Sequence, residues 1–293
     1  MPIYLNGTFV EPAEAKISVM DRGLLFGDSV YEVMRAFEGV PIDLDWHIER
    51  FRHSLSESGI TGWDPAEMGP LSVEMLRRNG TPNANLYWQA TRGQARKRAH
   101  LPEAGLRPNV FGFADAMPSL PEAAAEMRNI TAILRPDLRW KRCDIKSNGL
   151  LPNVMGKMEA QGAGADEIIM HRDGFITEGA AANIFIVKGG KVFTSADRQP
   201  VSILHGVTRR VVLEMLKAAP VFERPISIDE FETADEVLAT SVTLLVGNVS
   251  HVDGRPIGTG KPGPFGTLLH RAMIEAIRRQ ISMQASAALA ASA

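Results

Sequence analysis

Residues 140–151 read Trp-Lys-Arg-Cys-Asp-Ile-Lys-Ser-Asn-Gly-Leu-Leu and hold a lysine, Lys146, between apolar neighbours. Ile145 precedes it, and Leu150 and Leu151 follow it, so the residue types favour a buried setting. Burial disfavours the charged ammonium form, and a neutral lysine amine is a nucleophile that can form a Schiff base with a carbonyl compound. An exposed lysine beside a loop is the alternative that this stretch leaves open.

A second motif downstream of Lys146 has two parts. Residues 178–185 read Glu-Gly-Ala-Ala-Ala-Asn-Ile-Phe, and residues 204–209 read Leu-His-Gly-Val-Thr-Arg. With Lys146, they resemble the signature of the class IV, pyridoxal-phosphate-dependent aminotransferase family. That signature has a glutamate, a small residue, an asparagine, an apolar and an aromatic residue, and ends in apolar-x-Gly-apolar-x-basic. The resemblance covers nearly the whole chain except its C-terminal tail, and within the family it is closest to the D-amino-acid transaminases.

The composition is that of an ordinary globular protein. The 293 residues are 45% hydrophobic and 23% charged, which is enough to bury the cores of about two domains. Lysine and arginine total 32 against 34 acidic residues, which argues against nucleic acid or an anionic membrane as the main partner. The single cysteine, Cys143, excludes an intramolecular disulfide and suits a reducing compartment, so we expect a cytoplasmic protein. We find no signal segment and no apolar run long enough to span a membrane.

The pattern of residues 1–117 predicts a small α/β domain. Asn6-Gly7 between two short apolar runs predicts a hairpin. Apolar residues at helical spacing from Leu44 to Leu55 predict an amphipathic helix that ends at Gly59. The other elements expected here are strands at 30–37, 86–92 and 110–113, and a helix opened by Asp64-Pro65 and closed by Gly80.

A linker is expected at 118–121, because Pro118 and Pro121 resist both helix and central strand. A larger domain should follow over 122–283, and an Ala/Ser-rich, frayed tail over 284–293. Expected in the larger domain are strands at 130–134, 168–170, 184–187 and 237–240, hairpin turns at Asp173-Gly174 and Gly189-Gly190, and helices at 153–161, 206–217 and 267–281. The fold class is therefore α/β with α+β character. The family resemblance implies the two-domain fold type IV, whose larger C-terminal domain is a pseudo-barrel.

The resemblance also implies which residues serve pyridoxal 5'-phosphate. Lys146 would form the Schiff base with the cofactor and later move a proton from the substrate. Glu178 would face the pyridine nitrogen and keep it protonated. Arg50 matches the family's phosphate arginine, although a plain ion-pair role stays open. The remaining matches are Leu204 against the ring, Val207 and Thr208 at the start of a predicted helix, and Ser241 and Val242 at a second phosphate turn. No His/Cys set has zinc spacing, so we expect no metal.

Three residues are implied in substrate binding. Arg98-Ala99-His100 matches a segment of the D-amino-acid transaminases, in which this arginine and histidine hold the substrate α-carboxylate together with the residue matched by Tyr31. A guanidinium suits that task, because its planar fork matches two carboxylate oxygens. The loop before Arg98 is longer than in that subgroup by a residue, and a merely solvated basic loop is the alternative. In the subgroup these two residues come from the neighbouring subunit, which implies a homodimer with shared active sites.

The sequence therefore predicts a pyridoxal-phosphate transaminase of D-amino acids such as D-alanine, acting through Lys146 with 2-oxoglutarate as the acceptor. Three alternatives stay open. A branched-chain L-amino-acid transaminase would share Lys146 and Glu178 but lack the Arg98-Ala99-His100 segment. An R-selective amine transaminase usually differs in the segment Val30-Tyr31-Glu32-Val33. An aminodeoxychorismate lyase would use the same cofactor and lysine but need no keto-acid acceptor.

Overall fold

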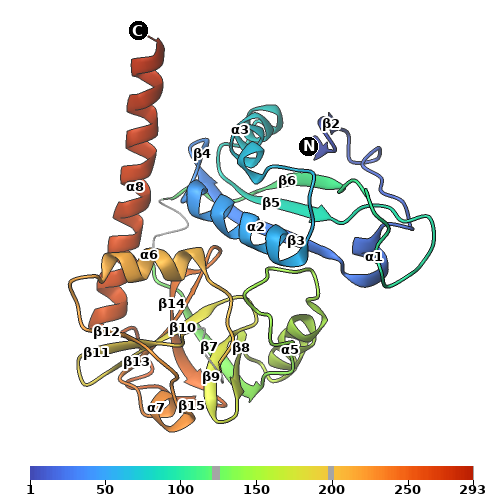
Figure 1. The fold of residues 1–293 in the computed structure, drawn as a ribbon. Coiled ribbons are helices and arrows are strands. Elements are labelled where there is room, and N and C mark those ends of the chain that lie inside the picture. Colours follow the sequence, from blue (N-terminus) through green and yellow to red (C-terminus); the bar gives the residue numbers. More distant parts are fainter. Residues whose placement is uncertain (121–125, 197–200, 293) are drawn as a thin grey trace. The chain divides into compact units, whose positions relative to one another are not determined.

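The computed structural model describes residues 1–120, 126–196 and 201–292 and separates the chain into two compact units. Unit 1 comprises Met1–Ala123, Ile145–Gly149 and Ile277–Ala293, and unit 2 comprises Ala124–Asp144 and Leu150–Ala276. Each unit has its own sheet with helices (Figure 1), which confirms the predicted α/β class. The predicted domain boundaries at 118–121 and 284 stay predictions, and Pro121 lies outside the described residues.

The sheet of unit 1 has six strands in the order β2-β1-β6-β5-β3-β4, and all its pairs are antiparallel. Side chains of β3 alternate, with Val30 and Met34 buried and Tyr31 and Val33 half-buried on the other face. The hairpin at the N-terminus and the three predicted strands are confirmed. The bounds are β1 (Ile3–Leu5), β2 (Thr8–Val10), β3 (Ser29–Phe37), β4 (Val40–Pro41), β5 (Ala84–Thr91) and β6 (Val110–Ala116).

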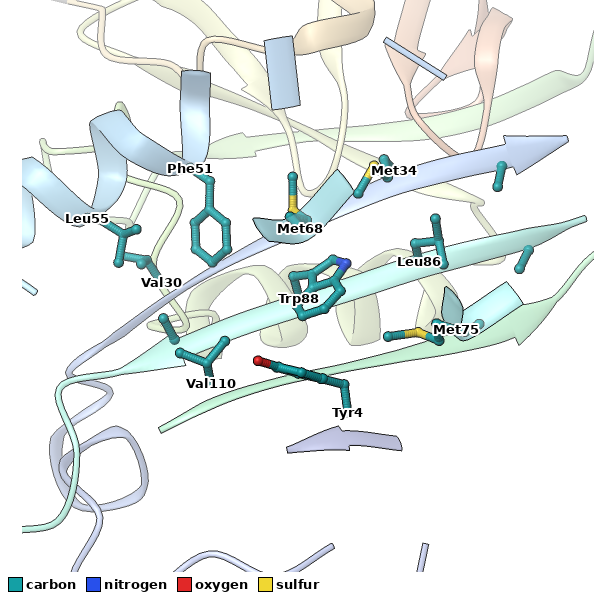
Figure 2. Close-up of a cluster of buried hydrophobic side chains, with 14 of the residues drawn as sticks. Tyr4, Val30, Met34, Phe51, Leu55, Met68, Met75, Leu86, Trp88 and Val110 are labelled. Atoms are coloured by element: carbon teal, nitrogen blue, oxygen red, sulfur yellow. The ribbon is translucent and has the colours of Figure 1, made fainter. Parts of the chain in front are cut away.

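Helices α2 (Leu44–Ser58) and α3 (Met68–Asn79) pack against one face of this sheet, and both end where the sequence predicts, at Gly59 and Gly80. Asp64 caps a short 3₁₀ helix, η1 (Pro65–Glu67), that leads into α3. Figure 2 shows the core between helices and strands, where Trp88 lies among Phe51 and Met68. Burying such a side chain contributes about 1.5–3 kcal/mol. Helix α1 (Arg22–Phe26) was not predicted, because five residues are too few to show a period.

Unit 2 is built on a sheet of nine strands, ordered β12-β11-β10-β13-β14-β7-β8-β9, with β15 paired to β14. The predicted hairpins at Asp173-Gly174 and Gly189-Gly190 are confirmed as the β8–β9 and β10–β11 connections. The bounds are β7 (Asn129–Pro136), β8 (Glu167–Arg172), β9 (Phe175–Gly179), β10 (Asn183–Lys188), β11 (Lys191–Thr194), β12 (Val221–Glu223), β13 (Glu236–Ser241), β14 (Leu245–Val252) and β15 (Arg255–Pro256).

This second sheet is curled. Strand β9 lies at one end of the strand order, yet the segment that follows β11, near the other end, reaches it: the Ser195 hydroxyl donates to the Ile176 carbonyl at 2.7 Å. The Ile176 amide in turn donates to the carbonyl of Ile226, just after β12, at 2.8 Å. A sheet whose two ends approach in this way forms a half-barrel, which confirms the expected pseudo-barrel.

Four helices complete the described fold of the second half of the chain: α5 (Leu151–Gly162), α6 (Val207–Met215), α7 (Ile228–Glu232) and α8 (Pro264–Ser292). The predicted helix at 267–281 is confirmed as part of α8, but the frayed tail expected from residue 284 is corrected, because α8 starts earlier and continues as one helix to Ser292. Alanine has the highest helix propensity, so an Ala/Ser-rich segment can extend a helix that has already been nucleated. Over the described residues, no helix combines the length and apolarity that a membrane span requires.

Candidate active site

The predicted nucleophile, Lys146, is half-buried in unit 1 beside strand β3. Its backbone amide donates to the Ser54 hydroxyl at 3.1 Å, and its carbonyl accepts from the Tyr31 amide at 2.9 Å. The Lys146 ammonium lies 4.3 Å from the centre of the Tyr31 ring, a cation–π distance. Ile145 is buried as expected, but the Leu151 side chain is 69% exposed, so the apolar setting predicted from the downstream leucines is wrong for that residue.

A polar cluster that the sequence did not reveal lies in the same unit as Lys146. The Asn148 amide donates to the Tyr87 hydroxyl at 3.1 Å and to the Gln89 side-chain oxygen at 3.2 Å. The rings of Tyr31 and Tyr87 are stacked at 5.7 Å, and Gln89 lies opposite Tyr31 in the β3–β5 register. These contacts depend on which residues face each other across two strands, and a single strand carries no sign of that register.

Arg50, the predicted phosphate ligand, is buried against Glu32. Its Nε donates to Glu32 Oε2 at 2.9 Å and its Nη2 donates to Oε1, while His47 Nδ1 lies 3.0 Å from Oε1. Burial alone would raise the pKa of the fully buried Glu32 carboxyl. The charge of Arg50 and the hydrogen bond of His47 outweigh it and hold that pKa well below its ordinary range. The ion pair left open by the sequence is therefore present, and the phosphate role stays a prediction.

Arg98 and His100, predicted to bind the substrate carboxylate, are exposed in the loop between β5 and β6. The Arg98 guanidinium lies 4.9 Å from the centre of the Phe26 ring, and the His100 ring lies 5.4 Å from it. Among the described residues, neither makes a hydrogen bond, ion pair or ring contact with Lys146 or Tyr31. The structure thus brings Tyr31 to Lys146 but not these two residues of the same chain.

Glu178 lies one residue before the end of strand β9 in unit 2, and its carboxylate is buried. Asn183 Nδ2 donates to Oε2 at 2.8 Å, the Leu204 amide donates to both oxygens at 3.1 Å, and Arg139 Nη1 donates to Oε1 at 2.5 Å. Burial raises the pKa of Glu178, and Arg139 offsets only part of that rise. The first part of the signature motif therefore surrounds a carboxylate that is fixed at both oxygens.

Arg139 is a partner of Glu178 that the sequence did not point to. Its Nε and Nη2 donate to the two oxygens of Asp137 at 3.0 and 2.8 Å, so the guanidinium is shared between two carboxylates. Arg172 Nη2 lies 3.3 Å from Asp137 Oδ2 and adds a second positive charge. No motif marks these positions, since a buried arginine and an exposed one look alike in a single sequence.

The second part of the motif begins helix α6. Asn183 Nδ2 also donates to the Leu204 carbonyl at 3.0 Å, and a Cβ on Gly206 would lie only 1.9 Å from Asn183 Oδ1, so a larger residue here would displace the Asn183 side chain. Gly206 is the N-cap, and within the described residues no side chain caps this end. The first amides of α6, at Val207 and Thr208, and the helix dipole therefore favour an anion.

Ser241 is the last residue of β13, and Val242 follows it in the turn that leads to β14. The Ser241 hydroxyl accepts from the Leu244 amide at 3.0 Å, which fixes the turn. Val242 can offer only its backbone amide to an anion. Across the part of the chain that the structure describes, no group of histidine, cysteine and acidic side chains is suited to hold a metal.

Comparison with known proteins agrees with these motifs. The family described as amino-transferase class IV matches residues 29–252. This chain belongs to that family. The D-alanine aminotransferases of Bacillus licheniformis and Staphylococcus haemolyticus are 39% and 37% identical to this class IV aminotransferase. They match over 90% and 89% of this chain and 93% of their own length.

Solved structures of class IV enzymes are also similar to this one. An Escherichia coli branched-chain amino acid aminotransferase has a TM-score of 0.85 and 26% identity, over 94% of this chain and 93% of that one. Another branched-chain amino acid aminotransferase, solved with pyridoxamine 5'-phosphate, has a TM-score of 0.85 and 29% identity, over 95% of this chain and 94% of that one. Both support the two-domain fold type IV that was expected.

The protein is thus a pyridoxal-phosphate-dependent aminotransferase that acts on small amino and keto acids. Each unit, taken by itself, offers groups of the kinds that this cofactor requires: unit 1 has the Lys146 amine beside an aromatic ring, and unit 2 has the buried Glu178 carboxylate and the uncapped start of α6. When bound, the cofactor draws electrons from the substrate α-carbon. The Glu178 carboxylate is held at both oxygens by its neighbours in unit 2, so its orientation is fixed within that unit.

Proposed function

We propose that this aminotransferase acts on D-amino acids, with a D-alanine-like donor and 2-oxoglutarate as the acceptor. The observation that carries this proposal is the similarity to two D-alanine aminotransferases at 39% and 37% identity over about nine-tenths of the chain. The Arg98-Ala99-His100 segment supports it, because a guanidinium and an imidazole on one exposed turn suit an α-carboxylate. A branched-chain activity would explain neither the higher identity to the D-alanine aminotransferases nor this segment. The two branched-chain enzymes of known structure named above are only 29% and 26% identical to this chain.

In this proposal the cofactor is served by the residues that the motifs predict. Lys146 Nζ would hold it covalently and, once released, would move the proton of the substrate α-carbon, and Glu178 would face the pyridine nitrogen. The phosphate is bound by Arg50, the amides of Val207 and Thr208, and Ser241 with the amide of Val242, while Leu204 packs against the ring. Support comes from the motif positions and from the hydrogen bonds that fix Glu178 and the start of α6.

We further propose that the enzyme is a homodimer whose subunits complete each other's sites. Arg98 and His100 contact Phe26 of their own chain, whereas Tyr31 contacts Lys146. A carboxylate held by all three of Tyr31, Arg98 and His100 would then need two chains. We also propose a cytoplasmic location, because the one cysteine is a free thiol and needs no oxidising compartment.

A branched-chain L-amino-acid substrate is the second candidate, because the similar solved structures named above are enzymes of that kind. Initial rates with D-alanine, L-leucine and R-1-phenylethylamine, each with 2-oxoglutarate, distinguish the candidates. We expect D-alanine to be fastest, with no turnover when the keto acid is omitted. Faster turnover of L-leucine would assign the branched-chain reaction, and an amine preference would make the protein an R-selective amine transaminase.

Arg98→Ala tests the carboxylate site within this proposal. Losing a charge-assisted pair to a carboxylate costs about 2–5 kcal/mol, so kcat/KM for D-alanine should fall by roughly 30-fold or more. The control is Arg96→Ala, since Arg96 lies in the same loop but pairs with Glu103. A similar loss in both variants would contradict a carboxylate role for Arg98.

Lys146→Ala tests the attachment residue. We expect the purified enzyme to be yellow, and borohydride should fix the cofactor to the peptide that contains Lys146. The variant should lose the visible absorbance, because alanine has no amine to bond the aldehyde. Peptide mapping that finds the label on another lysine, or on none, would overturn the assignment.

A further inference from the structure

Arg22, the first residue of helix α1 in unit 1, has a guanidinium that is only 4% exposed and has no part in the site described above. Its Nη1 donates to the Ala99 carbonyl at 2.6 Å and its Nη2 to the His100 carbonyl at 2.8 Å. Its Nε donates to Asp28 Oδ2 at 2.7 Å. One side chain therefore binds two successive carbonyls of the turn that carries Arg98 and His100.

Arginine suits this position for a geometric reason. Its planar fork aims parallel donors at two neighbouring oxygens, whereas a lysine ammonium is a point charge that cannot hold both in a fixed orientation. A buried charge also needs a counter-charge, which Asp28 provides. The Arg22–Asp28 ion pair therefore holds the backbone carbonyls of residues 99 and 100 in a fixed orientation.

Asp28 also connects Arg22, through Arg92, to the end of helix α2. Arg92 Nε donates to the same Asp28 oxygen at 2.8 Å, and its two terminal nitrogens donate to the carbonyls of Ser58 and Gly59 at the end of α2. Burial would raise the pKa of Asp28, but its hydrogen bonds to Arg92 and Arg22 keep that pKa below its ordinary value. The turn is thus tied through an ionised carboxylate to the core helix α2.

The base of the same loop is fixed separately by backbone contacts. The Arg22 amide donates to the Gly93 carbonyl at 2.9 Å, and the Ala95 amide donates to the Met20 carbonyl at 3.1 Å. Gly93 has a φ of 100°, and a Cβ there would lie 1.9 Å from the Arg107 carbonyl, so the two ends of the loop approach each other at a glycine. Backbone hydrogen bonds therefore hold the base of the loop, whereas the Arg22 side chain holds residues 99 and 100 near its tip.

Phe26, the last residue of α1, lies next to the side chains of Arg98 and His100. Its ring centre is 4.7 Å from the Arg22 guanidinium, 4.9 Å from that of Arg98, and 5.4 Å from the His100 ring. Cations near an aromatic face are held by its quadrupole. Both the backbone and the side chains of the 98–100 turn are therefore set by α1.

We propose that Arg22 is a positioning residue: by binding the Ala99 and His100 carbonyls, it fixes the turn whose Arg98 and His100 side chains recognise the substrate α-carboxylate. This inference rests on the proposed carboxylate role of that turn. It assigns Arg22 no contact with substrate or cofactor. Since donor and acceptor both carry an α-carboxylate, Arg22 affects the binding of both.

The test is Arg22→Lys, which keeps the charge beside Asp28 but loses the fork, with Arg96→Lys as the matched control in the loop. We expect KM for D-alanine and for 2-oxoglutarate to rise about tenfold, in line with the loss of charge-assisted hydrogen bonds, while kcat changes much less. The affinity for pyridoxal phosphate should not change. Arg22→Gln, which retains an amide donor, should raise KM less than Arg22→Ala does.

Trypsin digestion of the cofactor-free chain gives a readout that does not depend on activity. Cleavage after Lys97 and Arg98 should be several times faster in Arg22→Lys than in Arg96→Lys, because the turn is no longer held. Unchanged KM values, or an equal loss of kcat with no rise in KM, would overturn the proposal. If the enzyme prefers L-leucine, the proposed donor is wrong, and the KM for L-leucine then decides the role of Arg22 in the same way.

Discussion

Two glutamates, Glu32 in unit 1 and Glu178 in unit 2, are buried to a similar extent, and each accepts hydrogen bonds from an arginine. Their carboxyl groups nevertheless differ: the pKa of Glu32 is held below its ordinary value and that of Glu178 lies above it. Burial raises both, so the difference must come from the charges around them.

The arrangement of cations and anions explains the contrast. Glu32 accepts from two nitrogens of Arg50 and lies 3.0 Å from a ring nitrogen of His47, and both neighbours lower its pKa. Arg139 divides its donors between Glu178 and Asp137, and the negative charge of Asp137 itself raises the pKa of Glu178. An arginine next to a carboxylate therefore does not by itself determine the pKa of that carboxylate. A second carboxylate that shares the same arginine weakens the attraction that would lower the pKa.

The largest effect is expected from Arg50→Met. It leaves the Glu32 carboxylate buried without its main counter-charge, which should lower the free energy of unfolding by about 3–5 kcal/mol. Urea unfolding of the cofactor-free protein measures it. Arg52→Met is the matched control, since Arg52 lies on the same helix in an exposed pair with Asp64 and its loss should be near zero. Equal losses in the two variants would show that Glu32 does not depend on Arg50.

A smaller effect separates the two glutamates directly. Glu32→Gln removes a carboxylate that the fold holds ionised, and should cost about 1.5–3 kcal/mol, the range for hydrogen bonds to charged groups. Glu178→Gln should cost less, because the fold already favours the neutral form of that carboxyl. The same urea experiment ranks the two variants. The opposite ranking would contradict the charge balance inferred for the two clusters.

The pH dependence of the two variants should have opposite signs. Glu32 has a depressed pKa, so its contribution to stability is present above the unfolded value of about 4.3 and is lost as the pH falls below it. Glu178 has a raised pKa, so its contribution is full below about 4.3 and is lost as the pH rises through the folded value. Unfolding between pH 7 and 3 should therefore show the advantage of the wild type over Glu32→Gln shrinking and that over Glu178→Gln growing. Parallel curves would be inconsistent with opposite shifts.

The smallest effect concerns Cys143, which lies near the Glu178 cluster. Burial, together with the charges of Glu178 and Asp137, raises the pKa of its thiol to about 11 against the pull of Arg139. Glu178→Gln removes one of those negative charges and should lower that pKa slightly. The ultraviolet absorbance of the thiolate, followed against pH, measures it, and Glu32→Gln should leave it unchanged. No difference between the two variants would mean that Glu178 does not act on this thiol.

Much of the fold was predictable because its signals are local. The α2 stripe ended by Gly59 and the turn at Asp173-Gly174 were read from adjacent residues. Elements with short or uniform patterns were missed: α1 has five residues, and all but one residue of β14 is buried, which hides the alternation of a strand. The tail was misjudged because its Ala/Ser-rich composition was interpreted as fraying, although alanine has the highest helix propensity and a helix was expected directly before it.

The residues of the candidate site likewise divide into those that the sequence predicts and those that it does not. Lys146 and Glu178 could be singled out because they belong to a motif with fixed spacing along the chain. Their partners could not: Asn148 meets Tyr87 only through strand register, and Arg139, which follows β7, meets Glu178 on β9 only through the order of the strands in the sheet. Arg22 likewise acts on residues far along the chain, through carbonyl oxygens that every residue has.

Gly206 has a consequence for how related chains can diverge. A methyl group there would overlap the Asn183 side chain, and Asn183 in turn holds both Glu178 and the Leu204 carbonyl. The two positions are therefore coupled sterically: a chain that replaces Gly206 must also shorten or turn away the residue at 183. Such a lineage would lose a donor to the Glu178 carboxylate, so a substitution at the glycine predicts a change in the chemistry of a residue that it never touches.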